Sequence, residues 1–195
     1  MPTPNTNRPI GLLLAAGRGR RMGGRKQWHL WPTPQGNKPL VAAAFDAIDF
    51  VCDPMVVVLG HEADSVAKLL EDRMFQTVLS DPDAPMFESI RAGLKWTHQL
   101  NSRAHVLLHL ADHPEVAEST LQALIATAVK QPDRAILPDY RGRGGHPVLI
   151  PPAICCRIQE ANSPGGLRQF WLNHSKLCVR LPVDDQRTIH DIDTP

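Results

Sequence analysis

The sequence predicts a single α/β domain in which helices cover both faces of a mainly parallel sheet. Short apolar runs of the kind found in buried strands alternate along the chain with stretches of helical period. Parallel strands need crossover connections, and these place the intervening helices on the faces of the sheet. The chain has 195 residues and 43% of them are apolar, which is enough for one hydrophobic core. Together these observations predict a Rossmann-like, three-layer α/β domain.

Five apolar runs are the expected strands, and one-sided apolar stripes between them are the expected helices. The runs occupy residues 10–14, 55–59, 77–79, 105–110 and 135–137. The stripes lie at residues 40–48, 66–70, 90–94 and 121–128. A single helix therefore follows each of the first four strands, as in repeated βαβ units.

The pattern changes after Asp139. Residues 140–152 are rich in Gly, Arg and Pro and enclose a short strand at 146–150, which predicts a small inserted β-hairpin in place of another βα unit. Two irregular stretches, 17–38 and 140–145, are long for a compact domain. Loops of that kind are often functional.

Composition argues against several classes of partner. Lys and Arg number 21 against 20 Asp and Glu, so the formal charge of +1 provides no general attraction for nucleic acid or an anionic membrane. No apolar stretch reaches the roughly 18–20 residues of a membrane span, and residues 1–9 form a polar, flexible N-terminus without a signal-peptide core. The four cysteines include no CxxC pair, which favours reduced, structural thiols. We therefore expect a cytoplasmic protein that binds neither nucleic acid nor membranes, with its domain spanning residues 10–195.

A glycine- and arginine-rich loop follows the first predicted strand. Five of the nine residues from Arg18 to Lys26 are basic and none is acidic, a local charge of +5 in a chain whose total is +1. Glycines let the backbone approach a polyphosphate, while Arg and Lys neutralise phosphate charge. The loop therefore indicates a phosphate site, with a solvated basic loop or an RNA-binding patch as the alternatives. The loop is not a Walker loop, because Gln27 follows Lys26 where Ser or Thr is required. It is not a dinucleotide fingerprint either, because Met22 stands in place of the third glycine of that motif.

Two groups of carboxylates are candidate metal ligands. Asp112 closely follows the predicted strand at 105–110, at the edge of the sheet where open α/β domains bind ligands. A cap or turn residue is the alternative there. Near the C-terminus, alternation in Asp191, Ile192 and Asp193 would place both carboxylates on one side of an extended segment, as a shared cation requires. Here the alternative is a solvated acidic tail.

Residues 14–26, LAAGRGRRMGGRK, resemble the signature LAAGxGxRMGxxK of the molybdenum cofactor (molybdopterin) nucleotidyltransferases. Three further motifs of that family follow in order: Asp-x-Pro at 112–114, Gly-His-Pro at 145–147 and Asp-x-Asp-Thr-Pro at 191–195. The resemblance implies the NTP-transferase fold. It also implies a reaction with Mg²⁺ in which the phosphate of an acceptor attacks the α-phosphorus of a nucleoside triphosphate and pyrophosphate leaves.

The resemblance assigns roles to individual residues. It implies that residues 10–138 bind the nucleotide and that residues 139–195 bind the acceptor and complete the metal site. The implied nucleotide-binding residues are Ala15, Ala16, Gly17, Arg18, Gly19, Arg21, Lys26, Asp81 and Ser89. The implied catalytic residues are Arg21, Lys26 and Asp112, and the implied magnesium ligands are Asp112 and Asp193. The implied acceptor-binding residues are His113, Gly145, His146 and Arg168.

The resemblance specifies the base and the acceptor less closely. Relatives that use GTP tend to have Leu-Ala-Gly-Gly where this chain has Leu-Ala-Ala-Gly at 14–17, so CTP is favoured over GTP or ATP. Molybdopterin is the implied acceptor, and a molybdoenzyme is an implied recipient of the product. A sugar-phosphate nucleotidyltransferase and a non-catalytic nucleotide-binding or chaperone-like module are the alternatives. The chain departs from the family pattern at His113, where Gln is usual, at Asp81, where Asn is usual, and at Pro85, where Gly is usual.

Two further patterns have structural explanations. His105, His109 and His113 recur every four residues, but on a strand their side chains would lie about 13 Å apart, too far for one zinc ion. Trp28 and Trp31 follow the basic loop closely, and covering the core is favoured for them over lining the acceptor pocket.

Overall fold

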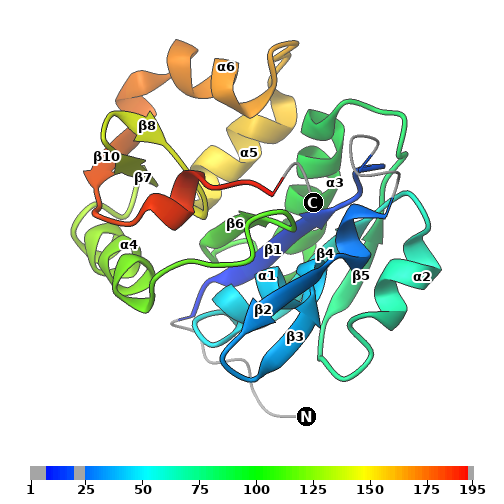
Figure 1. Ribbon diagram of the computed structural model, residues 1–195. Helices are drawn as coiled ribbons and strands as arrows, with labels where there is room; N and C mark the ends of the chain where they lie inside the picture. Colours follow the sequence, from blue (N-terminus) through cyan, green and yellow to red (C-terminus); the bar gives the residue numbers. More distant parts are fainter. Residues whose placement is uncertain (1–7, 20–24, 193–195) are drawn as a thin grey trace.

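The central sheet runs through the middle of the molecule (Figure 1). The structure is a computed structural model that describes residues 8–19 and 25–192. Four parallel strands form one half of the sheet, in the spatial order β6–β1–β4–β5. They are β1 (Ile10–Ala15), β4 (Met55–Leu59), β5 (Gln76–Leu79) and β6 (Val106–Leu110). The first four apolar runs of the sequence are therefore confirmed as strands.

The other half of the sheet mixes strand directions. The fifth predicted strand is confirmed as β7 (Ala135–Tyr140). β9 (Val148–Ile150) lies antiparallel between β6 and β7, and β10 (Cys178–Pro182) runs parallel to β7 on its other side. The full order is β10–β7–β9–β6–β1–β4–β5, with the short β8 (Arg143–Gly144) paired to β7.

The segment after Asp139 contains a short hairpin and a further strand, as the sequence suggests, but the strand expected at 146–150 is not part of the hairpin. In the segment 140–152, the chain folds back from β7 to β8 through a tight turn at Arg141 and Gly142, which have φ angles of 51° and 83°. It then enters β9, which is an internal strand of the main sheet and not part of an inserted hairpin.

A separate two-stranded hairpin forms within the stretch 17–38 that the sequence presents as irregular. Its strands are β2 (Leu30–Thr33) and β3 (Gly36–Pro39), which pair antiparallel. The residues of both strands are exposed or half-buried, so no apolar residue has to recur at every second position, and the alternation that identifies a strand in sequence is missing. Each strand also carries a proline, which is uncommon within strands.

Helices cover both faces of the sheet, as predicted. One face packs against α1 (Leu40–Asp49), α2 (Ala63–Lys68) and α4 (Glu118–Lys130). The other packs against α3 (Met86–Leu100), α5 (Pro152–Glu160) and α6 (Gly166–Asn173). Three single turns complete the described chain: η2 (Lys26–Trp28), η3 (Ser175–Leu177) and η4 (Gln186–Ile189).

Burial on both faces explains why the strands have continuous apolar sequences. In β1, Leu12 belongs to the core under α3 and α5, whereas its neighbour Leu13 belongs to the core under α1 and α4, and both side chains are fully buried. Of the helices that the structure describes, none is long and apolar enough to cross a membrane.

The fold brings the carboxyl ends of β1, β4, β5 and β6 to one edge of the sheet, because these strands are parallel neighbours. Ligands of open α/β sheets bind at this edge. Four connections leave this edge: the basic loop after β1, the short connection from β4 to α2, the connection from β5 to α3, and the segment from β6 to α4.

Candidate active site

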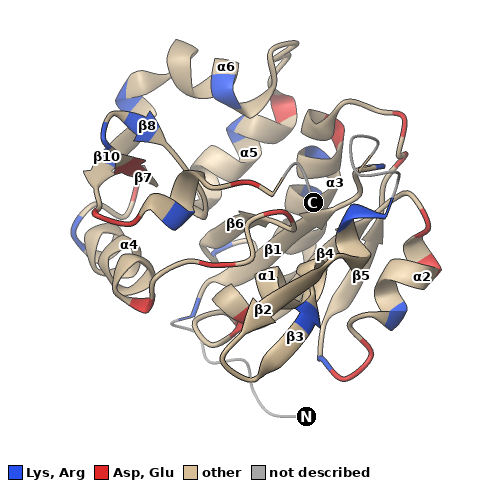
Figure 2. Ribbon diagram, viewed as in Figure 1, with Lys and Arg blue, Asp and Glu red and all other residues tan. Residues whose placement is uncertain are grey.

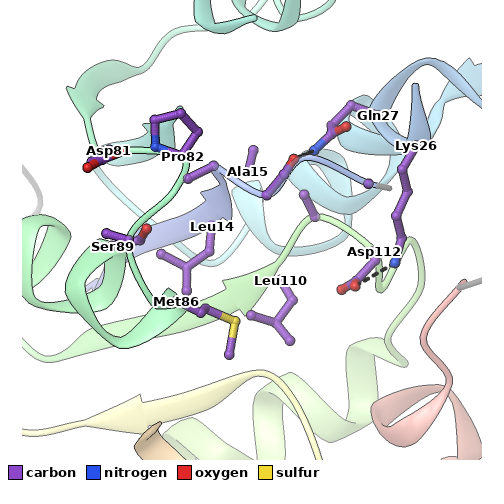
Figure 3. Close-up of a pocket in the computed structure, with 15 residues that line it drawn as sticks. Leu14, Ala15, Lys26, Gln27, Asp81, Pro82, Met86, Ser89, Leu110 and Asp112 are labelled. Atoms are coloured by element: carbon purple, nitrogen blue, oxygen red, sulfur yellow. Dashed lines mark hydrogen bonds and ion pairs between the residues drawn. The ribbon is translucent and has the colours of Figure 1, made fainter. Parts of the chain in front are cut away.

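A cavity of about 230 Å³ opens at this edge of the sheet (Figure 3). The residues that line it come from the end of β1 and the loop after it, from η2, from the β5–α3 connection with the start of α3, and from the end of β6. They are Leu14, Ala15, Ala16, Gly17, Gly19, Lys26, Gln27, Asp81, Pro82, Ala84, Met86, Ser89, Leu110, Ala111 and Asp112. The cavity therefore brings together most of the described residues that the sequence assigns to nucleotide binding.

Lys26 and Asp112 form an ion pair at one end of the cavity. The Lys26 Nζ lies 2.8 Å from Oδ2 of Asp112, and Figure 3 shows the two side chains pointing toward one another. Only 13% of the lysine side chain and 29% of the aspartate side chain are exposed. Partial burial reduces the screening of these two charges by solvent. The ammonium and the carboxylate therefore interact more strongly with each other, and with an ion bound nearby, than exposed charges would.

The second carboxylate oxygen of Asp112 is buried without a hydrogen-bond partner among the described residues. Such an acceptor is costly to bury unless a donor or a cation approaches it. A hard divalent cation such as Mg²⁺ prefers carboxylate oxygen, so the chemistry of this atom fits a metal ligand. No group of three or more His, Cys, Asp or Glu that could hold a metal ion occurs in residues 8–19 and 25–192.

The C-terminal segment reaches the same point. The backbone N–H of Ile192 donates to the carbonyl oxygen of Asp112 at 3.0 Å, and the Ile192 side chain is buried. This contact holds the segment at Ile192 beside the residue that follows β6. Asp193, the second ligand that the sequence predicts, lies outside the described residues.

The loop after β1 is held against η2 by two close contacts. The Gln27 side-chain amide donates to the carbonyl oxygen of Gly17 at 2.9 Å, and Gln27 is buried. Gly19 has a φ of 56°, and a Cβ there would lie 2.7 Å from Cβ of Lys26. Glycine is therefore required for this loop to pack against Lys26. The predicted catalytic residue Arg21 lies outside the described residues.

The β5–α3 connection forms the opposite wall, where Figure 3 places Asp81, Pro82 and Ser89. The Asp81 carboxylate accepts the backbone N–H of Asp83 at 2.8 Å, and the hydroxyl groups of Ser80 and Ser89 lie 2.9 Å apart. Arg18, from the loop after β1, forms an ion pair with Asp83 and so joins the two walls.

The predicted acceptor residues do not line the cavity. His113 and Gly145 are buried, and the ring of His146 packs edge to face against that of His113, with centroids 5.7 Å apart. The backbone N–H of His146 donates to the carbonyl oxygen of Thr188 at 2.8 Å, which ties this segment to η4. Arg168 is exposed on α6. The roles of all four residues in acceptor binding stay predictions.

Three imidazoles lie in a row beside Asp112, those of the buried His109 and His113 and that of the half-buried His146. The ring centroids of His109 and His113 are 6.1 Å apart, and His113 in turn touches His146. The spacing argument from sequence therefore fails for His113, because β6 ends at Leu110 and the chain turns back. Burial lowers the pKa of His109 and of His113 below the ordinary value and lowers the pKa of His146 to about 4. Burial therefore favours the neutral form of all three rings over the cationic form that would attract phosphate.

Sequence analysis missed several residues of the site. Gln27 anchors the loop, and its place directly after Lys26 is the one signal that sequence offers. Ala84 and Met86 line the cavity at and just before the start of α3, and nothing in their residue types indicates this before the fold is known.

The charges around the cavity are arranged as a phosphate and metal site requires. In Figure 2 the basic segment that enters η2 faces the acidic residues of the segment after β6 and of the C-terminal segment. The contacts of Asp112 with Lys26 and with Ile192 confirm that these three segments meet. The arrangement can hold a polyphosphate between the basic loop and a carboxylate-bound cation.

Comparison with known families identifies one match that spans most of the chain. The family described as MobA-like NTP transferase domain matches residues 11–177. The match begins in β1 and ends in η3, so it includes the whole cavity.

Three characterised proteins are similar over nearly their full length. "Nicotine blue oxidoreductase" of Paenarthrobacter nicotinovorans is 29% identical and covers 94% of this chain and 91% of its own. "Molybdenum cofactor guanylyltransferase" of Ectopseudomonas mendocina is 27% identical over 100% of this chain and 92% of its own. "Molybdenum cofactor cytidylyltransferase" of Escherichia coli is 26% identical over 94% of this chain and 90% of its own.

Solved structures share the fold. Rv0371c from Mycobacterium tuberculosis superimposes with a TM-score of 0.77 at 25% identity, covering 96% of this chain and 94% of that one. A nucleotidyl transferase from Methanothermobacter superimposes with a TM-score of 0.75 at 18% identity, covering 96% of this chain and 92% of that one. The α/β fold predicted from sequence is therefore confirmed.

Proposed function

Because this chain belongs to the MobA-like NTP transferase family and is a nucleotidyltransferase, we propose that it transfers CMP from CTP to the phosphate of molybdopterin. The reaction releases pyrophosphate and depends on Mg²⁺. The proposal joins the site described above to the family motifs of the sequence, which point to a phosphorylated pterin as the acceptor.

The observation that carries the proposal is the Lys26–Asp112 pair at the end of a cavity lined by the glycine loop. Phosphoryl transfer needs charged groups of both signs in fixed positions. A cationic side chain neutralises the phosphates, and a carboxylate binds the metal ion. The acceptor phosphate is already an anionic nucleophile. The site therefore needs to position and neutralise the reactants, and it needs no general base.

Asp112 and Asp193 would hold the metal ion, with Oδ1 of Asp112, which is buried and accepts no hydrogen bond from the described residues, as a ligand atom. A bound Mg²⁺ supplies positive charge to the phosphate oxygens during transfer. On ligand entry, Lys26 would exchange part of its contact with Asp112 for phosphate oxygens. Lys26 and Arg21 would then neutralise charge on the departing pyrophosphate, while the backbone of Gly17 and Gly19 contacts the triphosphate.

Cytidine is proposed as the nucleoside on the basis of the Leu-Ala-Ala-Gly sequence at the end of β1. Both a guanylyltransferase and a cytidylyltransferase are among the similar proteins, at 27% and 26% identity, so overall similarity does not separate the two bases. Asp81 and Ser89 line the wall opposite Lys26 and are the proposed contacts to the nucleotide on that side.

A sugar phosphate is the alternative acceptor within the same reaction class. The observation that disfavours it is the Gly-His-Pro segment at 145–147, which in this chain connects β8 to β9 beside His113. Redox chemistry, suggested by the name of one similar protein, is disfavoured because the loop after β1 lacks a dinucleotide fingerprint and concentrates basic residues.

The experiment that tests the proposal measures pyrophosphate release from purified protein. CTP, GTP and ATP are each combined with molybdopterin or with a hexose 1-phosphate, with Mg²⁺ and with the metal chelated. We expect release with CTP and molybdopterin and only in the presence of Mg²⁺. Release with a sugar phosphate alone would favour the alternative acceptor, and absence of release under every condition would favour a non-catalytic module.

A further inference from the structure

One partly exposed aromatic side chain lies outside the cavity and is hydrogen-bonded to the segment that follows Asp112. The indole N–H of Trp31, on β2, donates to Oε1 of Glu115 at 3.3 Å. Glu115 follows Asp112 by three residues, a span of at most about 11 Å of extended chain. The indole is therefore bonded to the same short segment that carries the candidate metal ligand.

Trp31 differs from the other three tryptophans of the chain. Trp28 packs against the core under α1, and Trp171 packs against the core under α3 and α5. Trp96 is also exposed, but it lies on α3 and donates to Gln76 of the edge strand β5. The expectation that the tryptophans after the basic loop cover the core therefore holds for Trp28, while Trp31 is half-exposed and belongs to neither core cluster.

The hairpin that carries Trp31 is braced from several directions. Trp31 is paired in register with Lys38 of β3, and the Lys38 ammonium forms an ion pair with Asp46 of α1 at 2.7 Å. Arg73 also binds Asp46, through two hydrogen bonds. At the base of the hairpin the backbone N–H of Leu40 donates to the carbonyl oxygen of His29 at 2.8 Å. The indole is thus presented by a rigid support, so little conformational freedom is lost when a ligand stacks on it.

Glu115 offers a second acceptor at the same place. Its Oε1 receives the indole N–H, and its Oε2 has no hydrogen-bond partner in the described part of the chain. A carboxylate oxygen of this kind accepts N–H groups on the edge of a ring, while an indole face attracts the flat surface of that ring. The indole face of Trp31 and the carboxylate of Glu115 are held side by side by their hydrogen bond. Together they fit a planar heteroaromatic ring that carries N–H donors on its edge.

We propose that Trp31 and Glu115 bind the ring of the acceptor, Trp31 by stacking and Glu115 by accepting ring N–H groups, while the acceptor's phosphate reaches Asp112. This inference rests on the proposed transfer to a phosphorylated heteroaromatic acceptor and adds the residues that select it. It extends the acceptor site to the β2–β3 hairpin, which the family motifs do not include. Trp31 and Glu115 determine which acceptor binds and take no part in the transfer itself.

The test compares two ligands that share a phosphate and differ in the ring. Isothermal titration without nucleotide measures binding of a phosphomethyl pterin and of glucose 1-phosphate. For Trp31→Ala we expect the dissociation constant of the pterin phosphate to rise roughly 5- to 150-fold, the range that loss of a stacking aromatic produces. Glucose 1-phosphate should bind wild type and Trp31→Ala equally. Trp31→Phe, which keeps a ring face, should restore most of the pterin affinity.

Two further variants make the test specific. Glu115→Gln keeps an acceptor for the indole N–H but replaces Oε2 with a donor, so it should weaken binding of the pterin phosphate and leave glucose 1-phosphate unchanged. Trp96→Ala is the control, because Trp96 is exposed and its indole N–H also donates to a side-chain oxygen, that of Gln76 on the edge strand β5. It should change the affinity for neither the pterin phosphate nor glucose 1-phosphate.

The inference is overturned if Trp31→Ala binds the pterin phosphate within about twofold of wild type, or if Trp96→Ala loses as much affinity. A wild-type protein that fails to bind the pterin phosphate also overturns it. Thermal stabilisation by CTP with Mg²⁺, measured on the same proteins, reports the nucleotide site separately. If CTP stabilises the protein and the pterin phosphate does not bind, the acceptor inference fails while nucleotide binding stands.

Discussion

The ammonium of Lys26 and the carboxylate of Asp112 lie 2.8 Å apart although 86 residues separate them in the chain. β1 and β6 are parallel neighbours, so the loop that follows one strand meets the residue that follows the other. The pair places the proposed phosphate-binding ammonium and the proposed metal-binding carboxylate in contact before any substrate arrives. Such preorganisation is the main way in which a site stabilises developing charge.

Asp112→Asn should lower turnover about 100-fold or more while the protein stays folded. The amide keeps the shape of the side chain but removes the charge that attracts Mg²⁺. Pyrophosphate release reports turnover, and circular dichroism with the melting temperature reports folding. Glu88→Gln, which removes a carboxylate paired with Arg91 on the surface of α3, is the control and should be close to wild type. Near-normal turnover in folded Asp112→Asn would remove this residue from the metal site.

Lys26→Ala should impair catalysis more than Arg25→Ala, although the two residues are adjacent and equally charged. Lys26 lines the cavity and contacts Asp112, whereas Arg25 is exposed. In a diffuse basic patch, screening over a Debye length of roughly 8 Å would make the two charges nearly interchangeable. Steady-state kinetics of both variants decides the matter, with the loss expected mainly in kcat for Lys26→Ala. Similar, modest losses in both variants would indicate general electrostatic attraction.

CTP with Mg²⁺ should raise the melting temperature by several degrees more than GTP does at equal concentration. A ligand that binds only the folded state adds about 2.7 kcal/mol at 100 times its dissociation constant. For a chain of this size, 1 kcal/mol corresponds to roughly 2–4 °C. Differential scanning fluorimetry measures the shift. An equal or larger shift with GTP would contradict the cytidine assignment and leave nucleotide transfer in place.

The free energy of unfolding should fall as the pH drops below about 6.5, the pKa of histidine in the unfolded chain. Burial lowers the pKa of His109 in the folded protein, so the unfolded state takes up its proton first and is favoured by acid. The stability from neutral His109 is complete above that pH and declines toward the lower folded pKa. Urea unfolding at pH 7 and pH 5 measures the change.

His109→Gln is the matched variant for this pH dependence, because Gln cannot titrate in the range. Its stability should depend less on pH than that of wild type, by up to about 1.4 kcal/mol per pH unit. Substituting the exposed His190 by Gln is the control and should leave the wild-type slope unchanged. A wild-type slope in His109→Gln would show that other groups cause the acid sensitivity.

Gly145→Ala should destabilise the protein by about 1–3 kcal/mol, whereas Gly144→Ala should be nearly neutral. A Cβ at Gly145 would lie 2.2 Å from the carbonyl oxygen of Thr188, which also accepts the N–H of His146. A Cβ at Gly144 would meet only the side chain of Arg180, at 3.6 Å. Urea midpoints of the two variants measure the contrast, and equal midpoints would mean that η4 moves aside without cost.

Much of the fold follows from local properties of the sequence. Apart from the buried His109 in β6, the residues of β1, β4 and β6 are apolar because helices cover both faces, and such a run is visible without any knowledge of contacts. The β2–β3 hairpin is invisible by the same reasoning, since its residues are partly exposed and lack alternation. The position of β9 inside the sheet could not be predicted from the sequence either, because a strand of three residues does not specify which other strands it pairs with.

The sequence by itself determined the α/β class, the basic loop after β1 and the carboxylate after β6, because each depends on residues that are neighbours in the chain. Tertiary structure alone decided that Lys26 contacts Asp112, that His113 folds back onto His109, and that Trp31 meets Glu115. The first and last of these contacts join segments more than 80 positions apart, and the second depends on where β6 ends and the chain turns. The distance between such segments is set by the parallel order of the strands and by where each loop turns, and these depend on packing of the whole domain.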